Sequence, residues 1–131
     1  MWMAWQRAER AQEVKSVFPS EAAHVDIVPE LAPGEDGAVF DKVTMAAFEG
    51  TPLDLVLRDC GVSAVAILGV ALEIGVEPTV RHAADLGYLP ILITDACGAG
   101  NQEAGRRSLA SLEFAGDALL TDAAAFAAAL S

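Results

Sequence analysis

Three side chains that can do chemistry each follow an apolar run of this chain. Lys42 ends the first run, Glu73 lies in a short loop after the second, and Cys97 follows the third. An ammonium group stabilises negative charge, a carboxyl group transfers protons, and a thiolate is a nucleophile. Each also has a simpler interpretation. Lys42 can be a solvated lysine, Glu73 a surface or subunit-contact residue, and Cys97 a small buried residue with no histidine close in sequence to activate it.

The sequence predicts no metal centre and no cofactor. His82 has no second ligand nearby, so a helix-face or subunit-contact role is favoured over metal binding. Glu77 and Arg81 are four residues apart and are expected to form a pair on a helix surface. Residues 98–101 resemble a phosphate-binding loop but lack its third glycine and its lysine. The chain has two cysteines, which make neither a disulfide framework nor a metal cluster, and Cys60 is expected in the core.

The elements that would position these residues alternate along the chain. The predicted strands are Met1–Trp5, Ala38–Lys42, Ala64–Val70, Leu89–Thr94 and Ala118–Leu120. The predicted helices are one that follows Thr51 and Pro52, then Val76–Leu86, Asn101–Ala115 and a final alanine-rich helix capped by Asp122 or Thr121. Thr51 is the expected cap of the first helix, and Gly61 fits the left-handed position that ends it.

From Ala38 onward, strands and helices are joined by short connections. This alternation predicts a three-layer α/β/α domain with a mostly parallel, Rossmann-like sheet covered on both faces. Ligands of such sheets bind beyond the carboxyl ends of the strands. We therefore expect the strand ends at Lys42, 69–71, 95–97 and Thr121 to matter for function. The length of 131 residues predicts a single domain over 1–131.

Composition narrows the class of partner. The chain is 53% hydrophobic with a mean hydropathy of +0.39, which predicts a large buried core or a surface buried against another subunit. Its formal charge of −11 disfavours nucleic acid and anionic membranes as partners. No apolar run reaches the roughly 20 residues that a membrane-spanning helix needs. The N-terminus lacks a signal-peptide pattern, so a cytoplasmic location is expected.

Four segments occur in the order and spacing of a known set of motifs. They are Lys42 followed by Phe48-Glu49-Gly50-Thr51-Pro52-Leu53, then Gly69-Val70-Ala71, then Val76-Glu77-Pro78-Thr79-Val80-Arg81-His82-Ala83-Ala84-Asp85-Leu86-Gly87-Tyr88, then Asp95-Ala96. The first resembles a lysine followed by F-x-G-T-x-L, and the third resembles a C-V-x-x-T-x-x-x-A-x-x-x-G-Y helix. Both are motifs of the isochorismatase-like (cysteine hydrolase) family. The resemblance covers under half of the chain and implies that family's α/β/α fold.

The resemblance also implies roles for particular residues. In this family an aspartate acts as general base, a lysine stabilises developing negative charge, and a cysteine at a helix N-terminus is the nucleophile. Carried over by position, the lysine is Lys42. A cis peptide would join Val70 to Ala71, and the amides of Ala71 and Gly75 would hold the substrate oxygen.

Two parts of the family pattern are missing. The cysteine position holds Gly75, which has no side chain that can attack a substrate. The first family strand, which carries the aspartate, is also missing, because Met1–Trp5 resembles the second strand. Three explanations fit: the start site is misassigned, a partner chain supplies the strand, or Met1–Trp5 fills its place. Glu73 is a candidate substitute for the acid or base.

The resemblance implies a hydrolase of a small organic molecule that does not use a cysteine nucleophile. Some members that hydrolyse the vinyl ether of isochorismate also have glycine at the cysteine position. The acid or base would then be Glu73, or an aspartate supplied from outside this sequence. The alternative is a catalytically silent member that acts as a binding or assembly subunit. Since members of the family commonly associate through their helices, a homo-oligomer is expected.

Overall fold

The computed structural model describes Glu9 and residues 27–131. The chain divides into two units, residues 1–39 and residues 40–131. The described part of the first unit contains a short 3-10 turn, η3 (Pro29–Leu31). A second turn follows, in which the Gly37 N–H donates to the Gly34 carbonyl oxygen at 2.9 Å. The strand predicted over Met1–Trp5 lies outside the described residues.

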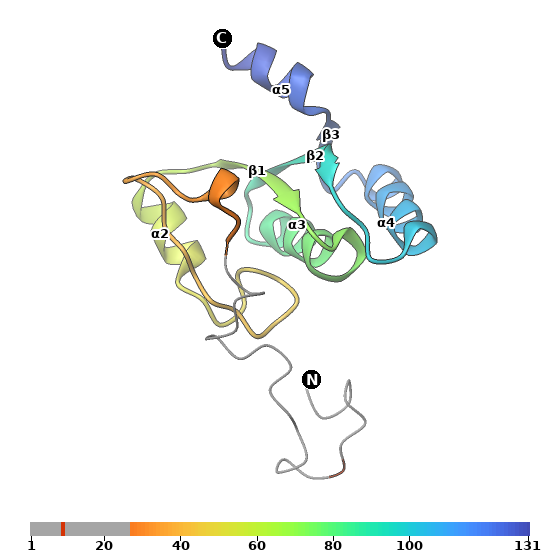
Figure 1. Ribbon diagram of the computed structural model, residues 1–131, viewed down its shortest axis with the longest axis horizontal. Coiled ribbons are helices and arrows are strands. Elements are labelled where there is room, and N and C mark those ends of the chain that lie inside the picture. Colours follow the sequence, from red (N-terminus) through yellow and green to blue (C-terminus); the bar gives the residue numbers. More distant parts are fainter. Residues whose placement is uncertain (1–8, 10–26) are drawn as a thin grey trace. The chain divides into compact units, whose positions relative to one another are not determined.

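The second unit is a parallel α/β arrangement (Figure 1). Its elements are α2 (Leu53–Asp59), β1 (Ala64–Gly69), the π-helical turn η4 (Leu72–Val76), α3 (Glu77–Asp85), β2 (Leu89–Cys97), α4 (Gln102–Ala115), β3 (Leu119–Thr121) and α5 (Ala123–Ala129). The described strands form one sheet in the order β1-β2-β3, and both pairings are parallel. The predicted parallel α/β fold is confirmed.

Helices cover β2 on both of its faces. Leu92 is fully buried in a core that includes Val80 of α3 and Leu112 of α4. Ile93, the next residue, must point to the opposite face because side chains alternate along a strand, and it is only 3% exposed. Helix α5 contacts β2 and lies away from α3 and α4 (Figure 1). The middle strand is therefore enclosed, as expected for a parallel sheet.

Side-chain caps fix where the C-terminal helices begin. The Asn101 side chain accepts a hydrogen bond from the Ala104 N–H at 2.9 Å, and the Asp122 carboxylate accepts one from the Ala125 N–H at 2.7 Å. Both satisfy backbone donors that have no partner inside their helix. The predicted caps at Asn101 and Asp122 are confirmed, and so is the left-handed stop at Gly61, whose φ is +70°.

Three local predictions are wrong. Ala38–Lys42 is not a strand, because a strand needs a neighbour to take its backbone hydrogen bonds and the described sheet ends at β1. Pro52, not Thr51, is the cap residue of α2. The Thr51 hydroxyl donates to the Ala47 carbonyl oxygen, and its oxygen still accepts the N–H of Leu53, the first residue of α2, at 3.3 Å. Cys60 is exposed rather than buried, because α2 has already ended there.

Polar and aromatic contacts connect α2 and the segment before it to the residues that follow α3. The Tyr88 hydroxyl donates to Asp54 Oδ1 at 2.8 Å, and Arg58 donates to the Leu86 carbonyl oxygen at 2.9 Å. The Tyr88 ring stacks on Phe48, with 5.8 Å between centroids. Phe48 is 6% exposed and belongs to the core, so it anchors the segment that leads into α2. That segment also carries the atoms that contact Lys42.

Candidate active site

The Lys42 ammonium group lies beside Gly75. The point that a Cβ on Gly75 would occupy is 3.9 Å from Lys42 Nζ and 3.7 Å from the Met45 carbonyl oxygen. Lys42 Nζ donates to the carbonyl oxygens of Thr44 at 2.9 Å and Met45 at 3.1 Å. An ammonium group has three N–H donors, and within the described part of the chain two of them have acceptors, so a third can bind a substrate atom. The structure thus brings together two residues that are 33 positions apart in the sequence.

The loop between β1 and α3 has an unusual backbone. The Val70–Ala71 peptide bond is cis, at the position that the family resemblance implies. The turn η4 follows, and the N–H groups of Ile74, Gly75 and Val76 all donate to the Ala71 carbonyl oxygen, at 3.1, 2.9 and 3.3 Å. The Gly75 amide therefore has an intramolecular acceptor. The Ala71 N–H has none among the described residues, so it is the freer of the two amides expected to bind an oxygen.

Thr79 connects this turn to the segment that contacts Lys42. Its hydroxyl donates to the Gly75 carbonyl oxygen at 2.7 Å and accepts a hydrogen bond from the Ala47 N–H at 2.9 Å. Thr79 is 8% exposed. The sequence shows Thr79 as part of a helix motif, but its role as a bridge depends on a contact 32 residues away and has no local signal.

Glu73 is held by the start of α4. One carboxylate oxygen accepts the Asn101 N–H at 2.7 Å and the other accepts the Gly100 N–H at 3.2 Å. Hydrogen bonds from backbone amides, beginning with that of Glu73 itself, lower the pKa of this carboxyl group below its usual value. Glu73 is therefore a carboxylate at neutral pH. Its hydrogen bonds tie η4 to the loop that precedes α4.

The carboxyl end of β2 carries Asp95 and Cys97. Asp95 Oδ1 accepts the Ala123 N–H at 2.9 Å, so this carboxylate sits at the start of α5. The Cys97 thiol donates to the Ile93 carbonyl oxygen at 3.2 Å, and burial raises its pKa. A raised pKa keeps the thiol protonated, which is the opposite of what a nucleophile needs. These contacts favour the structural interpretation of Cys97.

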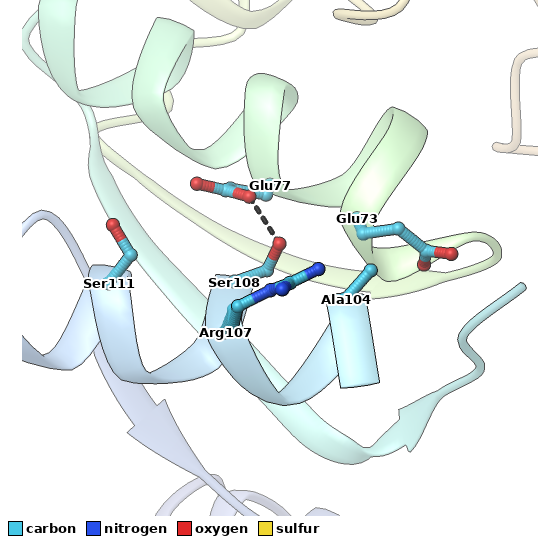
Figure 2. A pocket seen from close by; sticks show the side chains of 6 residues that line it. All are labelled: Glu73, Glu77, Ala104, Arg107, Ser108 and Ser111. Carbon is cyan, nitrogen blue, oxygen red and sulfur yellow. Dashed lines mark hydrogen bonds between the residues drawn. The ribbon is translucent and has the colours of Figure 1, made fainter. Parts of the chain in front are cut away.

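A groove lies between η4–α3 and α4 (Figure 2). It has a volume of about 370 Å³ and is lined by Glu73, Glu77, Ala104, Arg107, Ser108 and Ser111. Its lining includes neither Lys42 nor Gly75, so it is separate from the contact between those two residues. The Glu77 carboxylate in this groove accepts a hydrogen bond from the Ser108 hydroxyl.

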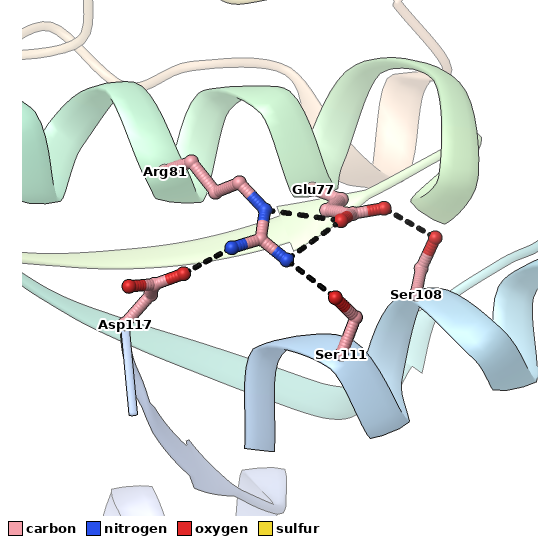
Figure 3. A network of polar contacts seen from close by, with 5 residues as sticks. All are labelled: Glu77, Arg81, Ser108, Ser111 and Asp117. Carbon is pink, nitrogen blue, oxygen red and sulfur yellow. Dashed lines mark hydrogen bonds and ion pairs between the residues drawn. The ribbon is translucent and has the colours of Figure 1, made fainter. Parts of the chain in front are cut away.

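Arg81 joins α3 to α4 and to Asp117, two residues before β3 (Figure 3). Its guanidinium donates to Glu77 Oε1 from two nitrogens, at 3.1 and 3.0 Å, and to Ser111 Oγ at 2.7 Å. It also pairs with Asp117. The predicted pair of Glu77 and Arg81 is confirmed, and the structure extends it into a network that links α3, which follows the turn η4 containing Gly75, to α4.

The described residues contain neither a group of side chains placed to hold a metal ion nor a membrane-spanning helix. No group of three or more histidine, cysteine, aspartate or glutamate side chains among them is arranged to hold a metal ion. No helix in residues 27–131 is long and apolar enough to cross a membrane.

Comparisons with known proteins agree on one family. A family model described as Isochorismatase domain matches residues 2–124. The chain is 41% identical over 91 residues to the uncharacterised isochorismatase family protein YwoC of Bacillus subtilis, covering 70% of this chain and 47% of that protein. It is 36% identical over 106 residues to the ureidoacrylate amidohydrolase RutB of Methylobacterium radiotolerans, covering 79% of this chain and 40% of that protein. The chain thus spans about half the length, or less, of the curated relatives it matches.

A solved structure shows the same fold. The isochorismatase-like hydrolase from Alkaliphilus metalliredigens superposes with a TM-score of 0.75 at 26% identity, covering 81% of this chain and 57% of that one. The family model accounts for nearly the whole sequence, and two of the motif segments, Gly69-Val70-Ala71 and Asp95-Ala96, lie at the carboxyl ends of the paired strands β1 and β2. The chain belongs to the isochorismatase family.

Proposed function

We propose that this chain is part of a hydrolase of a small organic molecule that does not use a cysteine nucleophile. The observation that carries the proposal is the contact between the Lys42 ammonium group and the Gly75 position, 3.9 Å from Nζ to the point of a Cβ. A cation held there can stabilise an oxygen that becomes negative during bond cleavage. Membership of a family that includes an amidohydrolase supports the same class of reaction.

The proposed site stabilises charge rather than forming a covalent intermediate. Gly75 provides no nucleophilic atom, so water would attack the substrate directly. Lys42 would supply a positive charge, and the amide of Ala71, after the cis peptide bond with Val70, would supply a neutral donor. The Gly75 amide would join them only in competition with its hydrogen bond to the Ala71 carbonyl oxygen.

The proton-transfer group of the proposed reaction is a carboxylate. Glu73 is the candidate within the chain, and its lowered pKa fits a base rather than an acid, although it lines the groove beside α4, which is separate from the contact between Lys42 and Gly75. The hydrogen bonds that the Glu73 carboxylate accepts from the Gly100 and Asn101 N–H groups also make it a weaker base. An aspartate from outside this sequence is the other candidate. Neither changes the role proposed for Lys42.

The test is hydrolysis by the full chain of two small molecules, ureidoacrylate and isochorismate. The wild type should turn over one of them, and Lys42→Met should lower kcat by about 100-fold, the loss typical for one group that stabilises an oxyanion. Arg106→Met is the matched control, because it removes a cation that is 74% exposed and lies outside both the Lys42–Gly75 contact and the groove that Glu73 lines, so it should leave kcat unchanged. Circular dichroism of each variant checks that folding is retained. Unchanged turnover by Lys42→Met would contradict the proposal.

The second candidate is a catalytically silent member that binds a small molecule or assembles with other subunits. It is favoured by Gly75 and by the hydrogen bonds that occupy the Glu73 carboxylate. In this case neither substrate is turned over, and Lys42→Met weakens ligand binding without any activity to lose. Isothermal titration with the same two molecules, and sedimentation analysis for a homo-oligomer, distinguish this function from hydrolysis.

A further inference from the structure

The Thr79 hydroxyl makes two hydrogen bonds beside the residues Lys42 and Gly75 of the proposed site. A threonine hydroxyl in a helix commonly donates to the carbonyl oxygen four residues earlier, and the bond from Thr79 to Gly75 is of this kind. The unusual part is the second bond, in which the same oxygen accepts the Ala47 N–H at 2.9 Å. Thr79 is nearly buried, at 8% exposure, so solvent does not readily replace either bond.

The two hydrogen bonds of Thr79 close a ring of contacts that includes the Lys42 ammonium group. One bond reaches Gly75, and the other reaches Ala47, two residues after Met45. The Met45 carbonyl oxygen accepts a hydrogen bond from Lys42 Nζ at 3.1 Å and lies 3.7 Å from the Cβ point of Gly75. Thr79 therefore links the backbone that holds the ammonium group to the turn that the ammonium group faces.

We propose that Thr79 is a positioning residue that holds the Lys42 ammonium group against Gly75. The inference deepens the proposed hydrolase function and rests on it for its effect on catalysis. A hydroxyl is required because one atom must donate to a carbonyl and accept from an amide. Serine retains both capacities, whereas valine has the shape of threonine and neither capacity. The two substitutions therefore separate the hydrogen bonds from the packing.

A thiol placed at position 75 reports the distance to Lys42 without any need for activity. Gly75→Cys is sterically allowed, because a Cβ there meets its neighbours at ordinary contact distance. A cation nearby stabilises the thiolate and lowers the thiol pKa from its ordinary value of about 8.5. The rate of iodoacetamide alkylation at position 75, followed by mass spectrometry from pH 6 to about 10, measures this pKa. The Cys60→Ser background removes an exposed competing thiol.

The expected results form one pattern. In the Gly75→Cys protein, Lys42→Met should raise the thiol pKa by about half a pH unit or more. Thr79→Val should raise it by a similar amount, and Thr79→Ser should leave it unchanged. Thr94→Val is the matched control, because it removes a threonine hydroxyl that donates to the Thr121 carbonyl oxygen between β2 and β3. It should also leave the thiol pKa unchanged.

Two outcomes overturn the inference. The first is a thiol pKa that responds to Lys42→Met but not to Thr79→Val, and the second is a thiol pKa that responds to neither. Hydrogen exchange at the Ala47 amide gives an independent check, and Thr79→Val should speed it at least 10-fold. In the protein with Gly75 retained, Thr79→Val should lower kcat more than it changes KM, with rescue by serine. A wild type that hydrolyses neither substrate contradicts the proposed function alone, since the thiol measurement still decides the positioning role.

Discussion

Lys42 Nζ lies 3.9 Å from the point that a Cβ on Gly75 would occupy, and the atom nearest to that point, the Met45 carbonyl oxygen, is 3.7 Å away, which is also an ordinary contact distance. The glycine is therefore not required by crowding. Gly75 also lies outside the glycines with positive φ, so its backbone conformation is open to any residue. The absence of a side chain at position 75 is a chemical feature of this chain, because neither space nor backbone geometry imposes it.

The first prediction concerns the substitution of Gly75 by alanine. Gly75→Ala should change the free energy of unfolding by less than about 1 kcal/mol, because the new methyl group makes ordinary contacts and restricts the unfolded chain. Gly105→Ala in α4 is the contrasting variant. Its methyl group would lie 2.6 Å from the Ala99 Cβ, and Gly105 is buried. It should destabilise by about 1–3 kcal/mol despite the better helix propensity of alanine. Urea denaturation measures both, and equal effects would contradict the prediction.

The second prediction concerns the network around Arg81 (Figure 3). Arg81→Met should lower the free energy of unfolding by about 1 kcal/mol, a value reduced for solvent screening because the side chain is 35% exposed. Arg81→Lys should recover only part of this loss, since an ammonium group cannot reproduce the two-nitrogen contact with Glu77.

Arg106→Met is the control for this network. Arg106 pairs with Glu103 on the surface of α4, where the two side chains are 74% and 55% exposed. Its replacement should change the free energy of unfolding by less than about 0.5 kcal/mol. If Arg106→Met lowered the free energy of unfolding as much as Arg81→Met does, the Arg81 network would contribute no more than an exposed ion pair.

Sequence patterns determine much of this fold and only part of the site. The strands β1 and β2 and the caps Asn101 and Asp122 are predictable because apolar runs and capping side chains act locally. β2 runs three residues beyond its predicted end at Thr94, because pairing with β1 carries its ladder to Cys97. The pattern of apolar residues within β2 does not reveal how far its pairing with β1 extends.

In the candidate site too, features set by nearby residues are predictable from the sequence, and contacts between distant residues are not. The family resemblance places Lys42, the cis peptide and Gly75 in order, because motif spacing survives in the sequence. It does not reveal that Glu73 bonds to the amides before α4 or that Thr79 bonds to Ala47. Both contacts join residues about 30 positions apart, so they depend on how η4 and α3 pack. The catalytic interpretation of Glu73 was open in the sequence for this reason.

The third prediction concerns the start of α5. Asp95 and Asp122 accept hydrogen bonds from the N–H groups of Ala123 and Ala125. A helix of seven residues is marginal alone, so these caps matter. Asp95→Ala and Asp122→Ala should each lower helix stability by about 1 kcal/mol. Hydrogen exchange at the Ala125 and Phe126 amides should become faster in both, whereas exchange in α4 should not change. Uniform acceleration across the unit would contradict a local capping role.

The fourth prediction concerns the pH dependence that Glu73 gives to folding. Its folded pKa is lowered below the ordinary value of 4.5, so the carboxylate stabilises the fold above that pH and loses this contribution as the pH falls through the folded value. Glu73→Gln does not titrate and cannot accept both amides as well as a carboxylate does. The variant should therefore be less stable than the wild type at pH 7, and the difference should shrink on acidification below about pH 4.5.

Urea denaturation of wild type and Glu73→Gln at pH 7, 5, 4 and 3.5 measures this difference. Glu49→Gln is the control, because the Glu49 side chain is exposed and its variant should follow the wild type at every pH. A difference for Glu73→Gln that stays constant with pH would mean that the variant changes packing rather than charge. A difference that grows on acidification would mean that the folded pKa is raised, which contradicts the hydrogen bonds from Gly100 and Asn101 as its cause.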